Sequence, residues 1–240
     1  MIKSVSFSKL QDFEQCPYRC KLKHVDRIPE EKHPAAERGT AIHQMAEDYV
    51  SGKLKSLPTE LMKFVDEFEV LRREFKAKKV SIEGEWGFDK EWMPTPYKTA
   101  WLRMKADAVY FISPTNAVVI DYKTGQSYGK EITHGEQVLL YAIATFTLWP
   151  ELQEITVELW YVDKDEMTQK HYTRAQALRH VQAYDKRMKK VTNAKEFPAN
   201  PTIFTCKYCA FGPSKGGQCE YGVTPGMQAD ALKTYRARFG

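Results

Sequence analysis

The sequence predicts an α/β protein with a cysteine-rich C-terminal part. Apolar residues recur at helical spacing over the first third of the chain, and short strand-like runs follow from Val80 onward. The chain has 240 residues, of which 42% are hydrophobic, so it can bury a proper core. We expect one compact domain made of three segments, namely an N-terminal helical segment (1–34), a core (35–200) and a cysteine-rich segment with a tail (201–240).

Composition limits the function classes. The net charge of +5 and the pI near 8.8 favour an anionic partner. No run of about 18 apolar residues is present, which predicts no membrane span. The first residues lack the apolar stretch of a signal peptide. We therefore expect a cytoplasmic protein whose thiols stay reduced, so its five cysteines are metal-ligand candidates before they are disulfides.

The N-terminal third should be helical. Ser6 is a typical helix cap, and Pro17 interrupts this helix and suits the first turn of the next one. A polar loop is expected at 27–34, followed by helices at about 35–49 and 59–76. The helix at 59–76 has a single apolar stripe and predicts core packing alone.

Two residues of the helix at 35–49 stand out. Gly39 and His43 lie one turn apart on one face. A glycine lets another segment approach a helix closely, and the histidine projects from the same side. The alternative is that His43 is an ordinary, partly buried core residue.

Three strands joined by short turns should form an antiparallel meander at about 80–92, 99–112 and 117–123. Asp107 lies within the second strand, and Asp121 and Lys123 end the third on one face. A salt bridge at the strand end would explain Asp121 and Lys123. Two carboxylates on adjacent strands, however, repel each other unless a cation lies between them, and Mg²⁺ suits such a pair.

The second half of the core should alternate between helix and strand. A helix at 133–148 carries Gln137 and Tyr141 on one face, which is either a polar edge or part of a site. A strand at 154–163 should pair with residues 169–173. A long helix at 174–195 follows, with an exposed basic side that is either solvated surface or a phosphate contact. The basic residues are Arg179, His180, Lys186, Arg187, Lys189 and Lys190.

The cysteines predict a metal-binding site. Cys206 and Cys209 form a C-x2-C pair, and Cys219 follows in a glycine-containing segment. Either Cys16 or Cys20 can supply a fourth thiolate. A C-x2-C pair alone is also compatible with a redox function. Four-cysteine ligation suits either an iron–sulphur cluster or structural zinc.

Taken together, these residues resemble a known family. The order Gly39-x3-His43, Asp107, Asp121-Tyr122-Lys123, Gln137-x3-Tyr141 is similar to that of the RecB-type branch of the PD-(D/E)XK nucleases. The resemblance covers roughly residues 35–145, and the flanking cysteines are similar to those of iron–sulphur nucleases of the AddB and CRISPR-adaptation exonuclease type. It implies a restriction-endonuclease-like core, with a mixed central β-sheet flanked by helices, and a stand-alone exonuclease of the kind found in phages.

The resemblance also implies residue roles. Mg²⁺ or Mn²⁺ would be held by His43, Asp107, Asp121 and the backbone carbonyl of Tyr122. Lys123 would orient the attacking water and stabilise charge on the phosphorus, and Gln137 and Tyr141 would position the DNA backbone. Glu85 is a further acidic candidate on the first strand. A [4Fe–4S] cluster, or structural zinc as the alternative, would be bound by Cys16, Cys206, Cys209 and Cys219, with Cys16 favoured over Cys20 by its Cys-Pro-Tyr context.

The expected function is metal-dependent exonucleolytic hydrolysis of single- or double-stranded DNA ends, in recombination, repair or phage DNA processing. An endonuclease of the same superfamily is the same-class alternative. A non-catalytic, metal-stapled nucleic-acid-binding module is the alternative of another class. A thiol-redox protein ranks last, because it explains none of residues 39–141. A homo-oligomer and a recombination partner protein are further expected associations.

Overall fold

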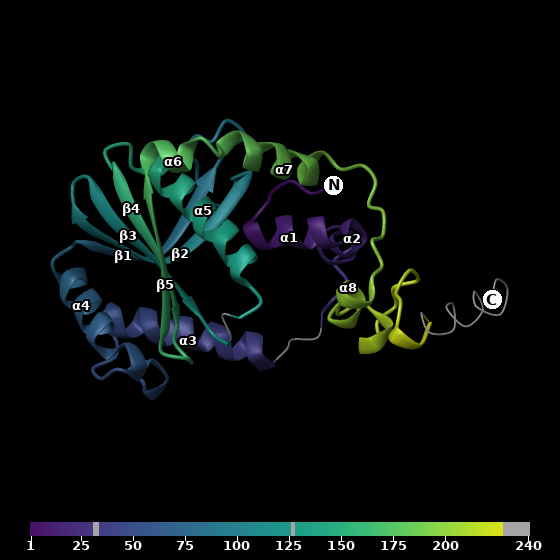
Figure 1. Ribbon diagram of the computed structural model, residues 1–240. Coiled ribbons are helices and arrows are strands. Elements are labelled where there is room, and N and C mark those ends of the chain that lie inside the picture. Colours follow the sequence, from purple (N-terminus) through teal and green to yellow (C-terminus); the bar gives the residue numbers. More distant parts are fainter. Residues whose placement is uncertain (31–33, 126–127, 228–240) are drawn as a thin grey trace. The chain divides into compact units, whose positions relative to one another are not determined.

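The computed structural model describes residues 1–30, 34–125 and 128–227, which form two compact units. One unit consists of the described parts of 33–186 (Figure 1). The other joins the described parts of 1–32 and 187–240. The polar loop predicted at 27–34 and the predicted C-terminal tail lie partly outside the described residues.

The unit 33–186 is built on a mixed β-sheet, which has five strands within the described residues, in the order β1-β2-β3-β4-β5. The first three strands form the predicted antiparallel meander, β4 runs parallel to β3, and β5 is antiparallel to β4. The predictions of a mixed sheet and of a meander are therefore confirmed. The strands are β1 (Val80–Phe88), β2 (Leu102–Ser113), β3 (Asn116–Lys123), β4 (Glu154–Tyr161) and β5 (Glu166–Thr173).

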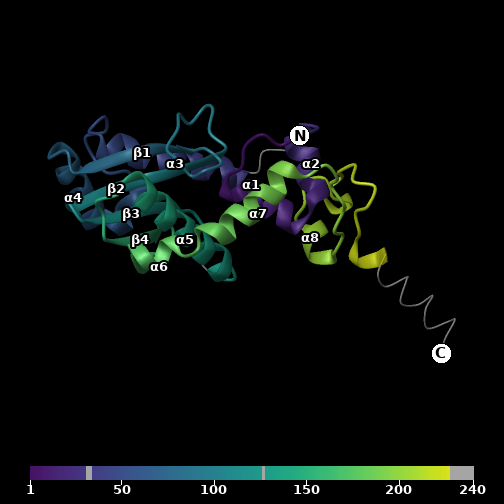
Figure 2. The ribbon, with the colours of Figure 1, turned by 90° about the horizontal axis from the view of Figure 1, so that it is seen from above.

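Helices cover both faces of this sheet (Figures 1 and 2). The apolar sides of α3 and α4 pack with Ile120, Tyr122 and Trp160 into a buried core cluster. On the other face, α5 and α6 pack against each other and contact β3, β4 and β5. The segment predicted as one helix at 59–76 begins as a 3-10 helix. These helices are α3 (Pro34–Val50), η1 (Thr59–Phe64), α4 (Val65–Lys76), α5 (Glu131–Leu148) and α6 (Arg174–Leu178).

The prediction of one long helix at 174–195 was wrong, because the structure divides this segment into α6 and α7 (Val181–Asn193). Thr173 starts α6 with a capping box, as its hydroxyl accepts from the backbone of Gln176 and the Gln176 side chain accepts from the backbone of Thr173. The chain then turns at Arg179 and His180, where the His180 N–H donates to the Ala177 carbonyl at 3.1 Å. Neither glycine nor proline marks this break.

The unit formed by 1–32 and 187–240 contains the predicted pair of N-terminal helices, α1 (Phe7–Gln15) and α2 (Pro17–His24). Ser6 caps α1 and Pro17 begins α2, as predicted. The later part of this unit includes two short helices, α8 (Ile203–Lys207) and η2 (Pro213–Lys215). The backbone N–H of Tyr18 donates to the carbonyl of Pro198 at 3.3 Å, which joins the two parts of the sequence.

Within the described residues, no helix has both the length and the apolar character needed to cross a membrane.

Candidate active site

Side-chain alternation on β3 divides its residues between the two faces of the sheet. Ile120 and Tyr122 belong to the core cluster shared with α3 and α4. Asp121 and Lys123 therefore face the side covered by α5, because successive side chains of a strand point in opposite directions. Asp121 is 5% exposed, which makes it one of the few buried charged residues in the described chain.

Four predicted residues meet at this end of β3. The Lys123 ammonium lies 2.5 Å from Oδ2 of Asp121 and donates to Oε1 of Gln137 at 2.9 Å. The Tyr141 hydroxyl lies 2.8 Å from Oδ1 of Asp121 and 2.6 Å from the carbonyl of Lys105. That hydroxyl has one hydrogen, so it donates to one of these acceptors at a time. Gln137 also contacts Tyr141, with 3.4 Å between its Nε2 and the hydroxyl.

Asp107 brings β2 and α3 into the same site. Its Oδ1 lies 2.8 Å from Nδ1 of His43, and its Oδ2 accepts the backbone N–H of Tyr122 at 2.6 Å. Burial raises the pKa of Asp107, and the negative charge of Asp121 raises it further against the opposing effect of His43. Burial lowers the pKa of His43, but the hydrogen bond and charge of Asp107 outweigh this and raise it overall.

One buried carboxylate oxygen of the site is balanced by a nearby charge rather than by a hydrogen bond. Oδ2 of Asp121 is buried and makes no hydrogen bond of good geometry, although the Lys123 ammonium lies close to it. A buried carboxylate oxygen without a hydrogen bond is costly unless a cation lies beside it. Lys123 supplies that charge here, and the oxygen keeps lone pairs that a divalent cation could also use. Two carboxylates are suitable ligands for Mg²⁺ or Mn²⁺. In the described part of the chain, however, no three His, Cys, Asp or Glu side chains already form a metal-binding group.

The turn after Lys123 is held by residues distant in sequence. Asp163 accepts the Gly125 N–H at 2.8 Å and binds the Arg38 guanidinium through both carboxylate oxygens. A Cβ at Gly39 would lie 3.2 Å from Oγ1 of Thr124, so the absent side chain lets this turn approach α3 closely. The close approach predicted at Gly39 is confirmed.

Glu85 does not join this group. It lies 3.2 Å from Lys105 and its side chain is half exposed. Glu83 also lies beside Lys105, with 3.9 Å between its Oε2 and the ammonium. Burial, followed by the charge of Asp107, raises the pKa of the Glu83 carboxyl. Glu83 has a φ of +48°, an uncommon backbone conformation for a residue other than glycine. The sequence analysis missed this residue, and nothing in the local sequence marks its conformation.

A second group of predicted residues lines one cavity in the unit formed by 1–32 and 187–240. Its volume is about 20 Å³, and Leu22 and Phe211 contribute apolar surface. The backbone N–H of Asn200 donates to Sγ of Cys16 at 3.4 Å. Burial raises the pKa of the Cys209 thiol. The cysteines that line this cavity are Cys16, Cys206, Cys209 and Cys219.

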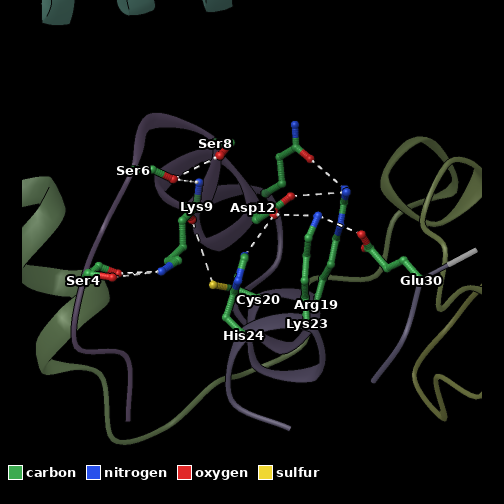
Figure 3. Close-up of polar contacts among 11 residues, drawn as sticks. Ser4, Ser6, Ser8, Lys9, Asp12, Arg19, Cys20, Lys23, His24 and Glu30 are labelled. Carbon is green, nitrogen blue, oxygen red and sulfur yellow. Dashed lines mark hydrogen bonds and ion pairs between the residues drawn. The ribbon is translucent and has the colours of Figure 1, made fainter. Parts of the chain in front are cut away.

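Cys20 is placed elsewhere. Its Sγ lies 3.9 Å from the carbonyl of Lys9, beside the polar side chains that surround Asp12 (Figure 3). Cys20 is completely buried, and burial, followed by the charge of Asp12, raises the pKa of its thiol to about 11. Asp12 forms ion pairs with Arg19 and Lys23. Cys20 therefore packs as a neutral thiol between the two N-terminal helices.

Backbone hydrogen bonds shape the loop that carries the last three cysteines. The N–H of Cys219 donates to the carbonyl of Phe211 at 2.9 Å, and the N–H of Cys209 donates to the carbonyl of Cys206 at 3.3 Å. At Gly217, a Cβ would lie 2.2 Å from the backbone of Phe211. A side chain there would clash with the Phe211 backbone, so this close approach of the loop to itself requires glycine.

A sequence comparison identifies a family that extends over both units. The sequence model of the PD-(D/E)XK nuclease superfamily matches residues 4–214. A comparison with curated proteins finds no match.

Two solved structures resemble this chain. One is described as "Putative exonuclease" from Eubacterium rectale, with 15% identity, 86% of each chain covered and a TM-score of 0.50. The other is SSO0001, with 16% identity, 92% of this chain and 88% of that chain covered, and a TM-score of 0.44. At these identities, the first likeness supports the fold alone.

Proposed function

Because the chain belongs to the PD-(D/E)XK nuclease superfamily, we propose that it is a Mg²⁺- or Mn²⁺-dependent DNA exonuclease of the RecB-type branch. One observation carries this proposal: Asp107, Asp121 and Lys123 lie together on adjacent strands, and a buried oxygen of Asp121 makes an ion pair with Lys123 but no hydrogen bond of good geometry. A binding-only protein gains nothing from such a costly set of buried charges. The description "Putative exonuclease" belongs to that neighbour, and exonucleolytic cleavage is extended to this chain only as part of this proposal.

The metal ligands would be Asp107, Asp121, His43 and the carbonyl of Tyr122. When bound, a divalent cation supplies a water of lowered pKa and neutralises charge on the phosphate. The N–H of Tyr122 holds one oxygen of Asp107 and the imidazole of His43 holds the other, so this carboxylate is oriented in advance. Tyr141 orients Asp121 in the same way.

Lys123 would act on the attacking water and on the charge that develops at phosphorus. Its ammonium is positioned by Asp121 and by Oε1 of Gln137. A positive charge fixed in advance, in a partly buried site, stabilises a transition state more than a mobile one does. Gln137 would also donate to the DNA backbone, since its amide nitrogen makes only a long contact with Tyr141.

The decisive experiment compares linear and covalently closed circular DNA, both labelled, with Mg²⁺ or Mn²⁺. An exonuclease degrades the linear DNA from its ends and leaves the closed circle intact. Asp121→Asn keeps the shape of the side chain but removes its charge, and we expect cleavage to fall by about 10³-fold or more. Wild-type activity in a folded Asp121→Asn protein would contradict the assignment of this site. Cleavage of the closed circle would instead favour the endonuclease alternative.

We also propose that Cys16, Cys206, Cys209 and Cys219 bind a [4Fe–4S] cluster, with structural zinc as the alternative. Support comes from their shared cavity and from the separate position of Cys20. Four thiolates suit either group, and hydrogen bonds to sulphur, such as that from Asn200 to Cys16, tune such clusters. In this proposal the group joins the N-terminal helices to the C-terminal loop.

Anaerobic purification tests this second proposal. A brown protein with broad visible absorbance and about four iron atoms per chain would support the cluster. A colourless protein with one zinc per chain would support the alternative. A protein with neither metal would contradict both.

A further inference from the structure

A cavity of about 360 Å³ opens beside the candidate active site, between α5 and the strands β4 and β5. Its volume lies within the range of pockets that bind small ligands. Val138, Val157 and Leu159 lie at its base with almost no exposed surface, and polar side chains surround them. The polar residues lining the cavity are Glu131, His134, Tyr161, Thr168, Gln169 and Lys170.

Strand register places this cavity next to the catalytic strand. Asp121 of β3 is opposite Leu159 of β4, and Leu159 is opposite Thr168 of β5. In the same way, Lys123 is opposite Tyr161. Residues in register share a face of the sheet, and neighbouring strands lie about 4.8 Å apart. The cavity therefore begins one strand away from Asp121 and Lys123, on the face where α5 lies.

The helix above the cavity also contributes to the active site. His134, Gln137 and Tyr141 are spaced three and four residues apart, so they lie along one face of α5. Gln137 and Tyr141 contact Lys123 and Asp121, respectively. His134 lines the cavity one turn earlier. A ligand in the cavity would thus contact the same helix that positions the catalytic side chains.

The cavity wall has a neutral imidazole, a positively charged side chain at one edge and a negatively charged side chain at the other. Nδ1 of His134 lies 2.7 Å from the hydroxyl of the buried Tyr161, and the two rings are 5.8 Å apart. Burial, followed by the positive charge of Lys123, lowers the pKa of His134 to about 4, so its imidazole is neutral at pH 7. Lys170 lies exposed on the edge strand. Glu131, which accepts the Gly129 N–H, makes the opposite rim acidic.

We infer that this cavity binds the nucleoside of the nucleotide next to the scissile phosphate, with its base beside the ring of His134. The flanking phosphate would lie toward Lys170 and away from Glu131, as charge requires. Aromatic and apolar surfaces bind bases without strong sequence preference, which suits an enzyme that acts on successive nucleotides. This inference rests on the proposed nuclease function.

Gly135 allows a direct test, because it lines the cavity and a Cβ there meets no atom within 4 Å. Gly135→Phe should fill the cavity without a backbone clash. In metal-free buffer we expect it to weaken binding of a fluorescein-labelled single-stranded 10-mer by about tenfold, measured by anisotropy. Ile132→Phe is the matched control, since it adds the same ring to the same helix at a side chain that is 84% exposed and outside the cavity. It should bind as the wild type does.

Abasic substitution supplies the second measurement. Oligonucleotides with a single abasic site, moved along the strand, should show one position that weakens binding to the wild-type protein by about tenfold. That penalty should vanish in Gly135→Phe and persist in Ile132→Phe. Thermal melts establish that each variant is folded. Equal binding by Gly135→Phe and the control, or an unchanged abasic penalty, would overturn the inference.

The two proposals fail in different ways. If wild-type protein cleaves no DNA with Mg²⁺ or Mn²⁺ but the abasic penalty follows the cavity, the nuclease proposal falls and the nucleoside site stands. If cleavage requires Asp121 but no abasic position matters, the nucleoside site falls and the nuclease proposal stands. Lys170→Ala adds a third variant, which should reduce the salt dependence of log Kd by about one unit of slope.

Discussion

The carboxylate site and the cysteine-lined cavity are held together in different ways. At the carboxylate site, Asp107 and Asp121 are each oriented by protein groups on regular strands and helices. In the other unit, four thiols line a small cavity formed by short helices and loops, beside a small apolar cluster of Leu22, Cys209 and Phe211. The difference leads us to expect that the carboxylate site keeps its geometry without a metal, whereas the proposed cysteine site depends on a bound group for stability.

Removal of Mg²⁺ and Mn²⁺ should give the largest effect on activity. It also tests the carboxylate site separately from the cysteine-lined cavity. We expect dialysis into buffer free of Mg²⁺ and Mn²⁺ to reduce DNA cleavage below detection, because activation of water requires the cation. The melting temperature should change little, since His43 and Lys123 already compensate the two carboxylates. Cleavage assays and thermal melts on the same sample check both points. A large fall in melting temperature would mean that the carboxylate site also depends on its metal to fold.

Removal of a cysteine ligand should give the second largest effect, and on stability rather than on chemistry. Cys209→Ser should lose the bound iron or zinc and lower the melting transition of its unit by about 10 °C or more, because metal binding is coupled to folding. Calorimetry and metal analysis measure the two outcomes.

Cys20→Ser is the matched control for that variant. Its thiol lies outside the cavity, so the metal content should stay at the wild-type value. Loss of metal from Cys20→Ser, with full retention in a Cys16→Ser protein, would reverse the assignment of the fourth ligand.

Substitution of Arg174 should lower the stability of the unit 33–186 without changing that of the other unit. Its guanidinium donates to the carbonyls of Phe146, Trp149 and Leu152, which are at or just beyond the C-terminal end of α5. Arg174→Met leaves these carbonyls without their donor and should cost about 2 kcal/mol of unfolding free energy. Arg174→Lys, which keeps the charge and part of the bonding, should cost less. Urea unfolding measures both, and the metal content of the cysteine-lined cavity should be unchanged in each.

The smallest expected effect is a pH dependence in the same unit. The pKa of His134 is lowered to about 4 by burial and by Lys123, from an ordinary value of 6.5. Between these values the unfolded chain binds a proton that the folded chain does not, so stability should decrease as pH falls from 6.5 toward 4. His134→Gln, which cannot be protonated, should flatten this slope. Urea midpoints at pH 7, 6 and 5 test it, and an identical slope in both proteins would exclude His134 as the cause.

Sequence reasoning predicted the parts of the site that depend on local pattern. Strand alternation predicted that Asp121 and Lys123 lie on one face of the sheet. Helical spacing predicted that Gln137 and Tyr141 lie on one face of their helix. It missed Glu83, because a positive φ interrupts the alternation of β1 without a glycine to signal it. It also missed the pairing of His134 with Tyr161, which depends on the register of β4 beside β3.

The fold, too, was predictable only where the local sequence marks the boundary of an element. The meander follows from turns that the sequence marks clearly, such as Pro114-Thr115-Asn116. The break between α6 and α7 has no such mark, because tertiary packing rather than a helix-breaking residue decides it. Arg174 reaches three carbonyls from its position at the start of α6, a constraint that no periodicity reveals.

The division of the chain has a consequence for its synthesis. Residues 33–186 are contiguous and can fold once they have left the ribosome, but α1 and α2 belong to a unit completed by residues after 186. At about 5–20 residues per second, the N-terminal helices wait roughly 10–40 s for these partners. During that time Cys16 remains without the other cysteines of its cavity. If the cysteines bind a cluster or zinc as proposed, loading of that site follows the synthesis of Cys219 and is a late step of maturation.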